Sequence, residues 1–381
     1  MIKIKSDKII VGESLFDGYL FIDNGKIVKL SKTDDFSCEL FDYTGSYVSA
    51  GFIDIHTHGA GGFDFLTTSE DEVINGLNFM VKKGATTVLP TISAAPVGDM
   101  VNALNAIKKA KQSGKIKCNV PGAHLEGPYF SPKQSGAQNP DSITPPVEKD
   151  YTAIIDKFSD CIARWSYAPE NDDGGKFCNY ITKHNIVASA GHTDAKYQDM
   201  KVAIDNGCSL VTHLYSCTST VTRNMGFRSL GVIESAFLRD ELYVEIIADG
   251  KHLPLDLIKM IIKIKGTDKV ALVTDSLCLA GSDVKEGVMN GIEYIVEEGV
   301  CRLKDRSAFA GSVATVDVLI KTLLECGYSL PTAVKMLTEV PANIMKLKKG
   351  KLANGYDADV IVFDDDVKIS NVFVLGNKIE I

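Results

Sequence analysis

The feature that most constrains the fold of this chain is a regular alternation of short β-type segments with helical segments. Apolar runs rich in β-branched residues recur roughly eight times, with helical patterns between them. This alternation is typical of βα units whose strands pair in a parallel sheet. The expected strands cover residues 47–55, 86–92, 119–125, 163–168, 186–190, 209–214, 243–248 and 270–273. The sequence therefore predicts the α/β class and a (β/α)8 barrel of the TIM type.

Helix signals between the strands support this pattern. Ser69 and Glu72 have the spacing of a capping box, and Gly84 is a helix stop. The first barrel helix is expected between these signals. Further helices are expected over residues 98–112, 316–324 and 332–347.

The two ends of the chain resemble each other and differ from the middle. Both consist of short β-type runs, at residues 3–11, 19–22, 26–30, 360–363 and 371–375. The turn Asp23-Asn24-Gly25 is of the kind that joins hairpin strands. We therefore predict a small β-sandwich domain built from residues 1–47 and 350–381, beside a barrel of residues 48–349.

Composition limits the classes of function. The formal net charge of −8 argues against a nucleic-acid partner, and the short basic stretches at 108–117 and 346–351 are expected to face water. Nine cysteines occur without a CxxC pair, and the first residues enter a strand pattern rather than a secretory leader. Reduced thiols in a cytoplasmic protein are therefore expected. No apolar run approaches the ~20 residues that span a bilayer, so no membrane partner is expected.

A pair of histidines, His56 and His58, ends the first expected barrel strand. Residues i and i+2 of a strand point to one face, so both imidazoles can bind one ion. The same spacing also occurs by chance on hydrated strands. The histidines as a whole favour the metal, because all seven except the surface residue His184 lie at or just past strand ends. This set comprises His56, His58, His124, His192, His213 and His252.

Carboxylates occupy strand ends as well, and the working groups of a (β/α)8 barrel lie at those ends. Glu126 follows the third expected strand and Asp275 ends the eighth. Two imidazoles and a carboxylate leave an open position on a divalent ion, which predicts Glu126, His192 and His213 as the primary metal site. A second ion would use the histidine pair of the first strand, with Glu126 or Asp275 placed to bridge or complete the site. The sequence leaves open whether one ion or two are bound. Ordinary polar residues at strand ends explain any one of these positions, but explain the whole set poorly.

Two further residues are assigned roles by their type and position. Asp275 has no required role as a ligand, so it is predicted to act as general base and then acid, moving a proton from water to the leaving amine. His252 is expected to orient the substrate or polarise its carbonyl, unless it is a solvated loop residue. Zinc is the first expectation for the ion, and iron, manganese and cobalt suit the same ligands.

The same positions carry a resemblance to a known family. In chain order they read His-Thr-His at 56–58, His-Leu-Glu-Gly-Pro at 124–128, Ala-Pro-Glu at 168–170, Gly-His at 191–192, Thr-His-Leu-Tyr at 212–215, Ala-Asp-Gly at 248–250 and Val-Thr-Asp at 273–275. This order resembles the amidohydrolase superfamily, and within it the N-acetylglucosamine-6-phosphate deacetylases. The resemblance implies a metal-dependent barrel with a β-sandwich made from both termini. It also implies that the N-acetyl group of N-acetylglucosamine 6-phosphate, or of a close N-acetylhexosamine 6-phosphate, is hydrolysed to acetate and the amino sugar phosphate.

Two segments depart from that family, and both concern substrate contacts. Where the family has Asn-Ala-Met after the Thr-His-Leu-Tyr motif, this chain has Ser216 and Cys217. Gln138 stands where the family has a histidine that contacts the substrate, and glutamine carries no charge. In the family an arginine reaches the phosphate of a neighbouring subunit, which implies a homodimer. Arg228 matches that arginine in better register than Arg223, although either one taken alone is an ordinary surface residue.

Three functions of different classes follow from these observations. The first is deacetylation of an N-acetylhexosamine 6-phosphate. The second is hydrolysis of a different N-acyl or cyclic amide without the 6-phosphate, which Gln138, Ser216 and Cys217 motivate. The third is a non-catalytic binding protein on the same scaffold, which leaves Asp275 and the metal set unexplained.

Overall fold

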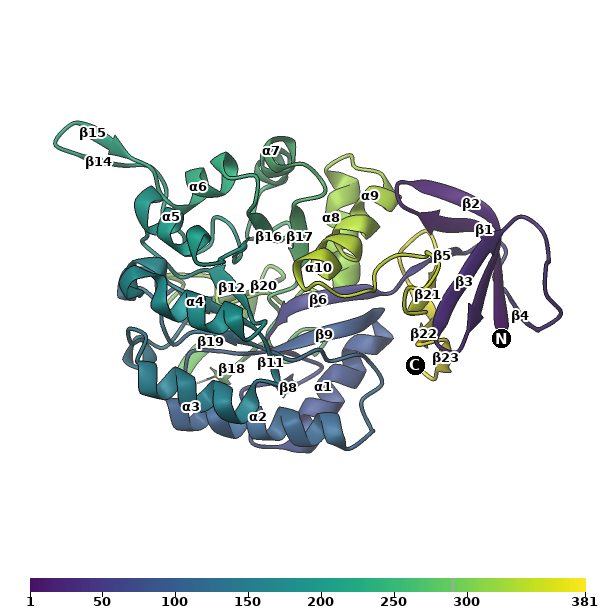
Figure 1. Ribbon diagram of the computed structural model, residues 1–381, viewed down its shortest axis with the longest axis horizontal. Helices are drawn as coiled ribbons and strands as arrows, with labels where there is room; N and C mark the ends of the chain where they lie inside the picture. The colour runs from purple at the N-terminus through teal and green to yellow at the C-terminus, as the bar shows by residue number, and fades with distance from the viewer. Residues whose placement is uncertain (290) are drawn as a thin grey trace.

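Eight parallel strands form a nearly closed barrel in this computed structural model, which describes residues 1–289 and 291–381. The strands are β6 (Phe52–Thr57), β9 (Ala85–Ile92), β10 (Ala123–Glu126), β11 (Ile162–Tyr167), β12 (Val187–Ala190), β13 (Leu210–Val211), β16 (Tyr243–Ile247) and β17 (Val270–Val273). Their order in the sheet is β17-β16-β13-β12-β11-β10-β9-β6. A bridge between Thr57 and Ser276 links the two ends of this order. The predicted barrel is confirmed (Figure 1).

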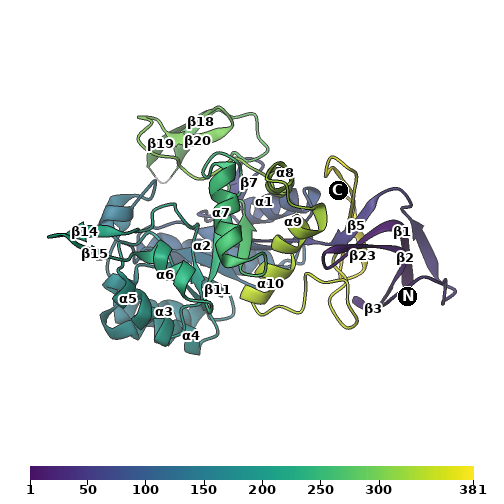
Figure 2. The same cartoon turned by 90° about the horizontal axis from the view of Figure 1, so that it is seen from above.

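Helices surround the barrel strands (Figures 1 and 2). They are α1 (Glu70–Lys82), α2 (Val97–Gln112), α3 (Glu148–Phe158), α4 (Lys176–Lys183), α5 (Tyr197–Asp205), α6 (Val232–Leu238), α7 (Leu255–Lys265), α8 (Val316–Glu325), α9 (Leu330–Met336) and α10 (Glu339–Ile344). Short 3₁₀ turns cover residues 132–134, 140–142, 169–171 and 173–175. Helix α1 begins as predicted, because the Ser69 hydroxyl accepts a hydrogen bond from the Glu72 N–H at 3.2 Å. None of the described helices is long and apolar enough to cross a membrane.

The helix predicted over residues 332–347 is wrong, because two short helices, α9 and α10, occupy this region. The Leu337 carbonyl lies at the break and accepts a hydrogen bond from the Ile53 N–H of β6 at 2.9 Å. In a continuous helix that carbonyl would face Pro341, which has no N–H and whose ring would clash with it. The break therefore pairs the Leu337 carbonyl with the Ile53 N–H and keeps it away from the Pro341 ring.

The first predicted strand, residues 47–55, is also divided in the structure. Its first part, β5 (Tyr47–Ala50), pairs with strands from the chain termini, and its second part, β6, belongs to the barrel. Gly51 separates them, and a Cβ atom at this position would lie 2.1 Å from Thr86 Oγ1. Glycine is therefore required where the chain crosses from one sheet to the other.

The second large sheet contains strands from both ends of the chain. In addition to β5, it contains β1 (Ile2–Val11), β2 (Ser14–Asp23), β3 (Lys26–Ser31), β4 (Glu39–Asp42), β21 (Val360–Phe363), β22 (Ile369–Val374) and β23 (Asn377–Ile379). Strand β1 pairs with β4 through residues 2–5 and with β5 through residues 8–9, on either side of a β-bulge. The predicted joining of the two termini is confirmed, whereas the exact domain limits remain a prediction.

Three small antiparallel sheets complete the structure. They are β7 (Gly59–Ala60) with β8 (Phe63–Asp64), the hairpin β14 (Thr222–Asn224) with β15 (Phe227–Ser229), and β18 (Glu286–Met289), β19 (Ile292–Glu297) and β20 (Val300–Leu303). The β14–β15 hairpin projects away from the body in both views (Figures 1 and 2). The β18–β20 sheet lies on one side of the barrel, where Figure 2 shows it above α7 and α8.

Phe363 of β21 packs the terminal sheet against the barrel. Its buried ring lies 5.6 Å from the Tyr47 ring and 6.2 Å from the ring of Phe52 in β6. We expect Phe363→Ala to lower the free energy of unfolding by about 3–5 kcal/mol, because it leaves a cavity between the two sheets. Chemical denaturation measures this loss. The matched control is Phe36→Ala, whose side chain is 37% exposed, and an equal loss in both variants would contradict the prediction.

Candidate active site

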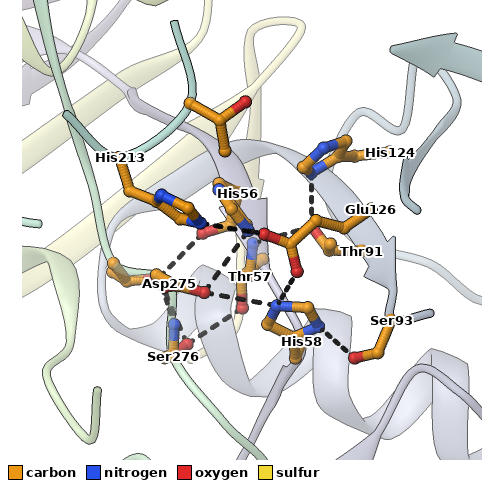
Figure 3. A network of polar contacts seen from close by, with 12 residues as sticks. His56, Thr57, His58, Thr91, Ser93, His124, Glu126, His213, Asp275 and Ser276 are labelled. Atoms are coloured by element: carbon orange, nitrogen blue, oxygen red, sulfur yellow. Dashed lines mark hydrogen bonds and ion pairs between the residues drawn. The ribbon is translucent and has the colours of Figure 1, made fainter. Parts of the chain in front are cut away.

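Six of the predicted functional side chains gather at the carboxyl end of the barrel. They come from strand ends or from the residues that follow: His56 and His58 at β6, Glu126 at β10, His192 after β12, His213 after β13 and Asp275 after β17. Every one of them is at most 7% exposed. Figure 3 shows five of the six as labelled side chains that point toward one another. Barrel geometry thus brings together residues that lie far apart in the sequence.

Several of these residues adopt a left-handed backbone conformation. The φ angles are 47° at His192, 26° at His213 and 45° at Asp275. Tyr215 and Cys217, in the loop after β13, also have positive φ angles. This conformation is unfavourable for residues with a side chain, and it concentrates at functional sites where the surrounding structure holds it in place.

The Glu126 carboxylate occupies the centre of the cluster. Its Oε1 lies 3.1 Å from His213 Nε2 and 3.3 Å from the Nε2 atoms of both His56 and His192. Its Oε2 lies 3.2 Å from His58 Nε2. One carboxylate therefore faces four imidazoles, all through the same ring nitrogen.

The Nδ1 atoms of these imidazoles are held by the surrounding chain. His192 Nδ1 lies 2.8 Å from the Gln134 carbonyl oxygen, and His213 Nδ1 lies 3.0 Å from that of Ser216. A carbonyl oxygen only accepts hydrogen bonds, so both Nδ1 atoms carry the proton. In the neutral rings, Nε2 of His192 and Nε2 of His213 therefore present lone pairs toward Glu126.

The other two imidazoles follow the same pattern. His56 Nδ1 lies 2.7 Å from Glu245 Oε1, and His58 Nδ1 lies 2.8 Å from Ser93 Oγ. His56 Nε2 is buried without a hydrogen-bond partner among the described residues. All four rings are thus oriented through Nδ1 and leave Nε2 for a further partner, which is the arrangement of metal-binding histidines.

The arrangement of donors fits a metal ion. The Nε2 atoms of His192 and His213 lie only 3.2 Å apart and face a carboxylate oxygen. Converging lone pairs are unfavourable unless a cation lies among them. Two groups have ligand atoms within 4.8 Å of one another, His56 with His58 and Glu126, and Glu126 with His192 and His213. Both consist of the nitrogen and oxygen ligands that zinc, iron, manganese and cobalt share.

The electrostatics of the site also favour positive charge. Burial lowers the pKa of His56, but the charges of Asp275, Glu126 and Glu245 outweigh burial and raise it to about 10. Burial likewise lowers the pKa of His58, but its hydrogen bonds to Asp275 and Glu126 prevail and raise it to about 9. The carboxylates around these imidazoles thus stabilise positive charge, which either a proton or a metal ion supplies.

Asp275 lies beside the two candidate metal-binding groups and also faces a cavity of about 300 Å³. Its Oδ1 lies 3.2 Å from His58 Nε2 and 3.3 Å from His56 Nε2. Burial raises the pKa of Asp275, but the charge of His56 and the hydrogen bond to His58 outweigh burial and lower it below its usual value. An ionised carboxylate at this position can accept a proton from a molecule bound in the cavity.

The cavity also receives four of the predicted substrate-binding residues: Gln138, Ser216, Cys217 and His252. Its other walls include apolar side chains of the β18–β20 sheet and its flanks, such as Ile292, Tyr294 and Phe309. His252 Nδ1 lies 2.8 Å from Asp249 Oδ2, and its ring lies 5.0 Å from that of Phe309. Asp249 therefore fixes the orientation of His252 at the cavity wall.

Gln138 makes a contact that the sequence did not predict. Its amide nitrogen donates a hydrogen bond to Glu126 Oε2 at 2.6 Å, and its amide oxygen accepts one from the Ala94 N–H at 3.0 Å. The second contact fixes which end of the amide faces the carboxylate. Gln138 thus holds Glu126 in addition to lining the cavity.

The two predicted arginines lie away from the cavity in the described chain. Arg223 is in β14 and Arg228 is in β15, where they face each other across the projecting hairpin. Both are exposed, and the Arg228 guanidinium donates a hydrogen bond to the Gly226 carbonyl oxygen. Neither arginine is among the residues that line the cavity.

Three further polar residues, His124, Arg164 and Glu245, are buried beneath the site. His124 faces Thr91 and Ser166, at 3.2 and 2.7 Å, and belongs to neither metal-binding group. Sequence reasoning missed Arg164 in β11 and Glu245 in β16, which are fully buried and form an ion pair. A charged residue within an otherwise apolar strand was the available signal, because such residues are rarely buried without a partner.

Candidate metal-binding groups of histidines and carboxylates at the carboxyl end of a nearly closed parallel barrel are the arrangement that metal-dependent hydrolases use. Residues 47–379 match the model of the Amidohydrolase family, so the chain belongs to this family. The predicted resemblance and the predicted class of enzyme are both confirmed, and the non-catalytic alternative is set aside.

Individual relatives are similar over most of their length. The N-acetylglucosamine-6-phosphate deacetylase of Bacillus subtilis is 30% identical over 96% of this chain and 93% of its own. The N-acetylgalactosamine-6-phosphate deacetylase of a Shewanella species is also 30% identical, over 87% of this chain and 83% of its own. The structure is similar to that of the N-acetyl-D-glucosamine-6-phosphate deacetylase of Mycobacterium smegmatis in complex with N-acetyl-D-glucosamine-6-phosphate. The TM-score is 0.91 and the identity 25%, over 99% of this chain and 98% of that one.

Proposed function

We propose that this enzyme hydrolyses the N-acetyl group of N-acetylglucosamine 6-phosphate to acetate and the amino sugar phosphate, a step in amino sugar catabolism. The observation that carries the proposal is the position of Asp275, which faces both the metal-binding groups and the cavity. The names of the relatives support the substrate. Glu126, His192 and His213 are the proposed primary ligands, and His56 and His58 with Glu126 are the proposed second group. Zinc is the proposed ion.

The proposed reaction assigns a role to each side of the cavity. When bound, a divalent ion polarises a carbonyl group and lowers the pKa of water toward ~7. The oxygen of water adds to the amide carbon, and Asp275 accepts one proton from that water. The carbon–nitrogen bond then breaks as Asp275 returns the proton to the leaving nitrogen. His252 orients the sugar, and Gln138, Ser216 and Cys217 line its binding site.

Acetate release tests the proposal directly. The zinc-loaded protein is assayed with N-acetylglucosamine 6-phosphate, N-acetylgalactosamine 6-phosphate and unphosphorylated N-acetylglucosamine, and the assay is repeated with manganese and ferrous iron. Strong turnover of the first substrate is expected. A preference for the galactosamine derivative would assign the other sugar, for which the Shewanella relative is named. No turnover of any of the three, with metal bound, would contradict the proposal.

A second candidate function is hydrolysis of another N-acyl or cyclic amide without a phosphate. It is favoured by the cavity wall, because the residues that line the cavity in the described chain include no lysine or arginine. A phosphate group is commonly bound by such cations. A panel of N-acyl amino acids and cyclic amides separates the two functions, since each predicts turnover of a different compound.

We propose that two chains form a homodimer. In this dimer, Arg223 and Arg228 of one chain's hairpin would supply the positive charge for the phosphate bound by the other chain. We expect replacement of both Arg223 and Arg228 by alanine to raise KM for the phosphorylated sugar by about 10- to 100-fold, the value of one charged hydrogen bond. KM for unphosphorylated N-acetylglucosamine should not change. The control is Arg239→Ala, which removes an arginine paired with Glu241. Equal effects on both substrates would contradict this role.

We also propose a cytoplasmic location. All nine cysteines are unpaired, which is typical of a reducing compartment. Fractionation of cells that produce the tagged full chain tests this proposal, and recovery in a membrane or secreted fraction would contradict it.

A further inference from the structure

A buried ion pair lies beneath the metal-binding groups, inside the barrel. Arg164 of β11 donates two hydrogen bonds to Glu245 of β16, from Nη1 to Oε2 at 2.6 Å and from Nη2 to Oε1 at 3.0 Å. Both side chains are completely buried. Strands β12 and β13 separate β11 from β16 in the sheet, so the pair spans the interior of the barrel. A buried charge pair is costly unless its remaining donors and acceptors are satisfied.

The arginine is satisfied by groups that belong to the barrel wall. Its Nε donates to Ser189 Oγ at 3.1 Å, its Nη1 to the Ile55 carbonyl oxygen at 3.2 Å and its Nη2 to Thr212 Oγ1 at 3.0 Å. Arg164 is therefore held by β6, by β12 and by the residue that follows β13. Its planar guanidinium therefore presents two N–H groups to the Glu245 carboxylate in a fixed geometry.

Glu245 uses the same carboxylate to reach both proposed metal-binding groups. Its Oε1 accepts hydrogen bonds from His56 Nδ1 at 2.7 Å and from the His213 backbone N–H at 3.1 Å. His56 belongs to one group and His213 to the other. The second contact also holds the left-handed backbone of His213, with its φ of 26°.

We propose that Glu245 is a positioning residue that holds one ligand of each metal-binding group, with Arg164 fixing its carboxylate. By accepting the Nδ1 proton of His56, Glu245 leaves Nε2 of that ring free as the ligand atom. By accepting the N–H of His213, it supports the turn that aims the second imidazole at Glu126. This inference rests on the proposed metal site but not on the identity of the substrate.

The alternative role of Glu245 is that of a counter-ion for Arg164 alone. Two double variants separate the roles, because both remove the ion pair and only one retains an acceptor. Arg164→Met with Glu245→Gln leaves an amide oxygen that can accept from His56 and His213. Arg164→Met with Glu245→Leu leaves no polar atom at this position. Replacing a buried ion pair by uncharged residues together avoids an unpaired buried charge.

Zinc affinity, measured by competition with a chromophoric chelator, is the first readout. We expect the leucine double variant to bind zinc about 10- to 100-fold more weakly than the glutamine double variant, the range found when outer partners of metal ligands are lost. Unfolding transitions of the two variants establish that both are folded. Equal zinc affinities in the two folded variants would overturn the proposal.

A second readout is taken on the unaltered protein, and it needs one further variant only to assign the signals. Histidine labelled with ¹⁵N reports which ring nitrogen carries the proton in the zinc-loaded enzyme, and His56→Asn identifies the His56 signals. We expect the proton of His56 on Nδ1, and a proton on Nε2 would overturn the proposal. Neither readout involves hydrolysis, so a failure of the proposed deacetylation would leave both results interpretable.

Discussion

Asp275→Asn is expected to lower kcat for acetate release by about 10²- to 10⁴-fold, the usual contribution of a general acid–base residue. Asparagine has nearly the same shape but cannot accept and return a proton. Asp275 Oδ1 lies at least 3.2 Å from the imidazoles of both His56 and His58, so the amide fits the same space. KM and bound metal should therefore change much less than kcat.

The experiment measures kcat, KM and metal content of the same preparations. The matched control is Asp64→Asn, which removes another poorly exposed carboxylate near the barrel mouth. Asp64 does not line the cavity, and its Oδ1 accepts a hydrogen bond from the Leu66 N–H. Full activity of Asp275→Asn would contradict the mechanism for every substrate considered. Because the charge of Asp64 acts on His58, an equal loss of kcat in Asp64→Asn would mean that loss of negative charge, and not of proton transfer, explains the effect.

The barrel and the members of the histidine–carboxylate cluster could be predicted because both depend on local patterns. Apolar runs alternate with helical patterns, and barrel strands place their carboxyl ends at one mouth. His192, His213 and Asp275 could therefore be assigned to one site although no short motif contains all three. The sequence needed only to indicate where each strand ends.

The supports of the cluster could not be predicted in the same way. Arg164 and Glu245 are 81 residues apart and meet only when the barrel curves. Their pairing depends on the register of four neighbouring strands, which local patterns do not determine. The contact between Gln138 and Glu126 depends on the path of a loop after β10. Apolar patterns say little about such paths.

Two of the differences between predicted and observed elements have a similar cause. Residues 47–55 form one apolar run, and only their pairing partners divide it between two sheets at Gly51. Residues 332–347 have a continuous helical pattern, and the break at Leu337 reflects a hydrogen bond from Ile53 of a distant strand. In both cases, tertiary contacts override a local preference.

The largest effect on the metal site is expected from Glu126→Gln. Oε1 of Glu126 faces the Nε2 atoms of three imidazoles, and Oε2 faces that of His58. Glutamine removes the negative charge and places an amide N–H group among these nitrogens, where it can donate to a lone pair. The protein should therefore fold but bind metal weakly at both groups. Loss of an outer partner of a metal ligand lowers metal affinity or activity roughly 10- to 100-fold. Because Glu126 is itself a proposed ligand, we expect kcat/KM to fall by more than this.

Metal content after dialysis against a chelator, together with kcat/KM, measures this effect. The matched control is Asp172→Asn, which alters a buried carboxylate that caps α4 by accepting from the Phe177 and Cys178 N–H groups. This control should retain its metal, because loss of a buried charge elsewhere does not affect the ligands. If Glu126→Gln retained one equivalent of metal, one group would hold its ion without this carboxylate. That result would contradict a centre in which a single glutamate serves both groups.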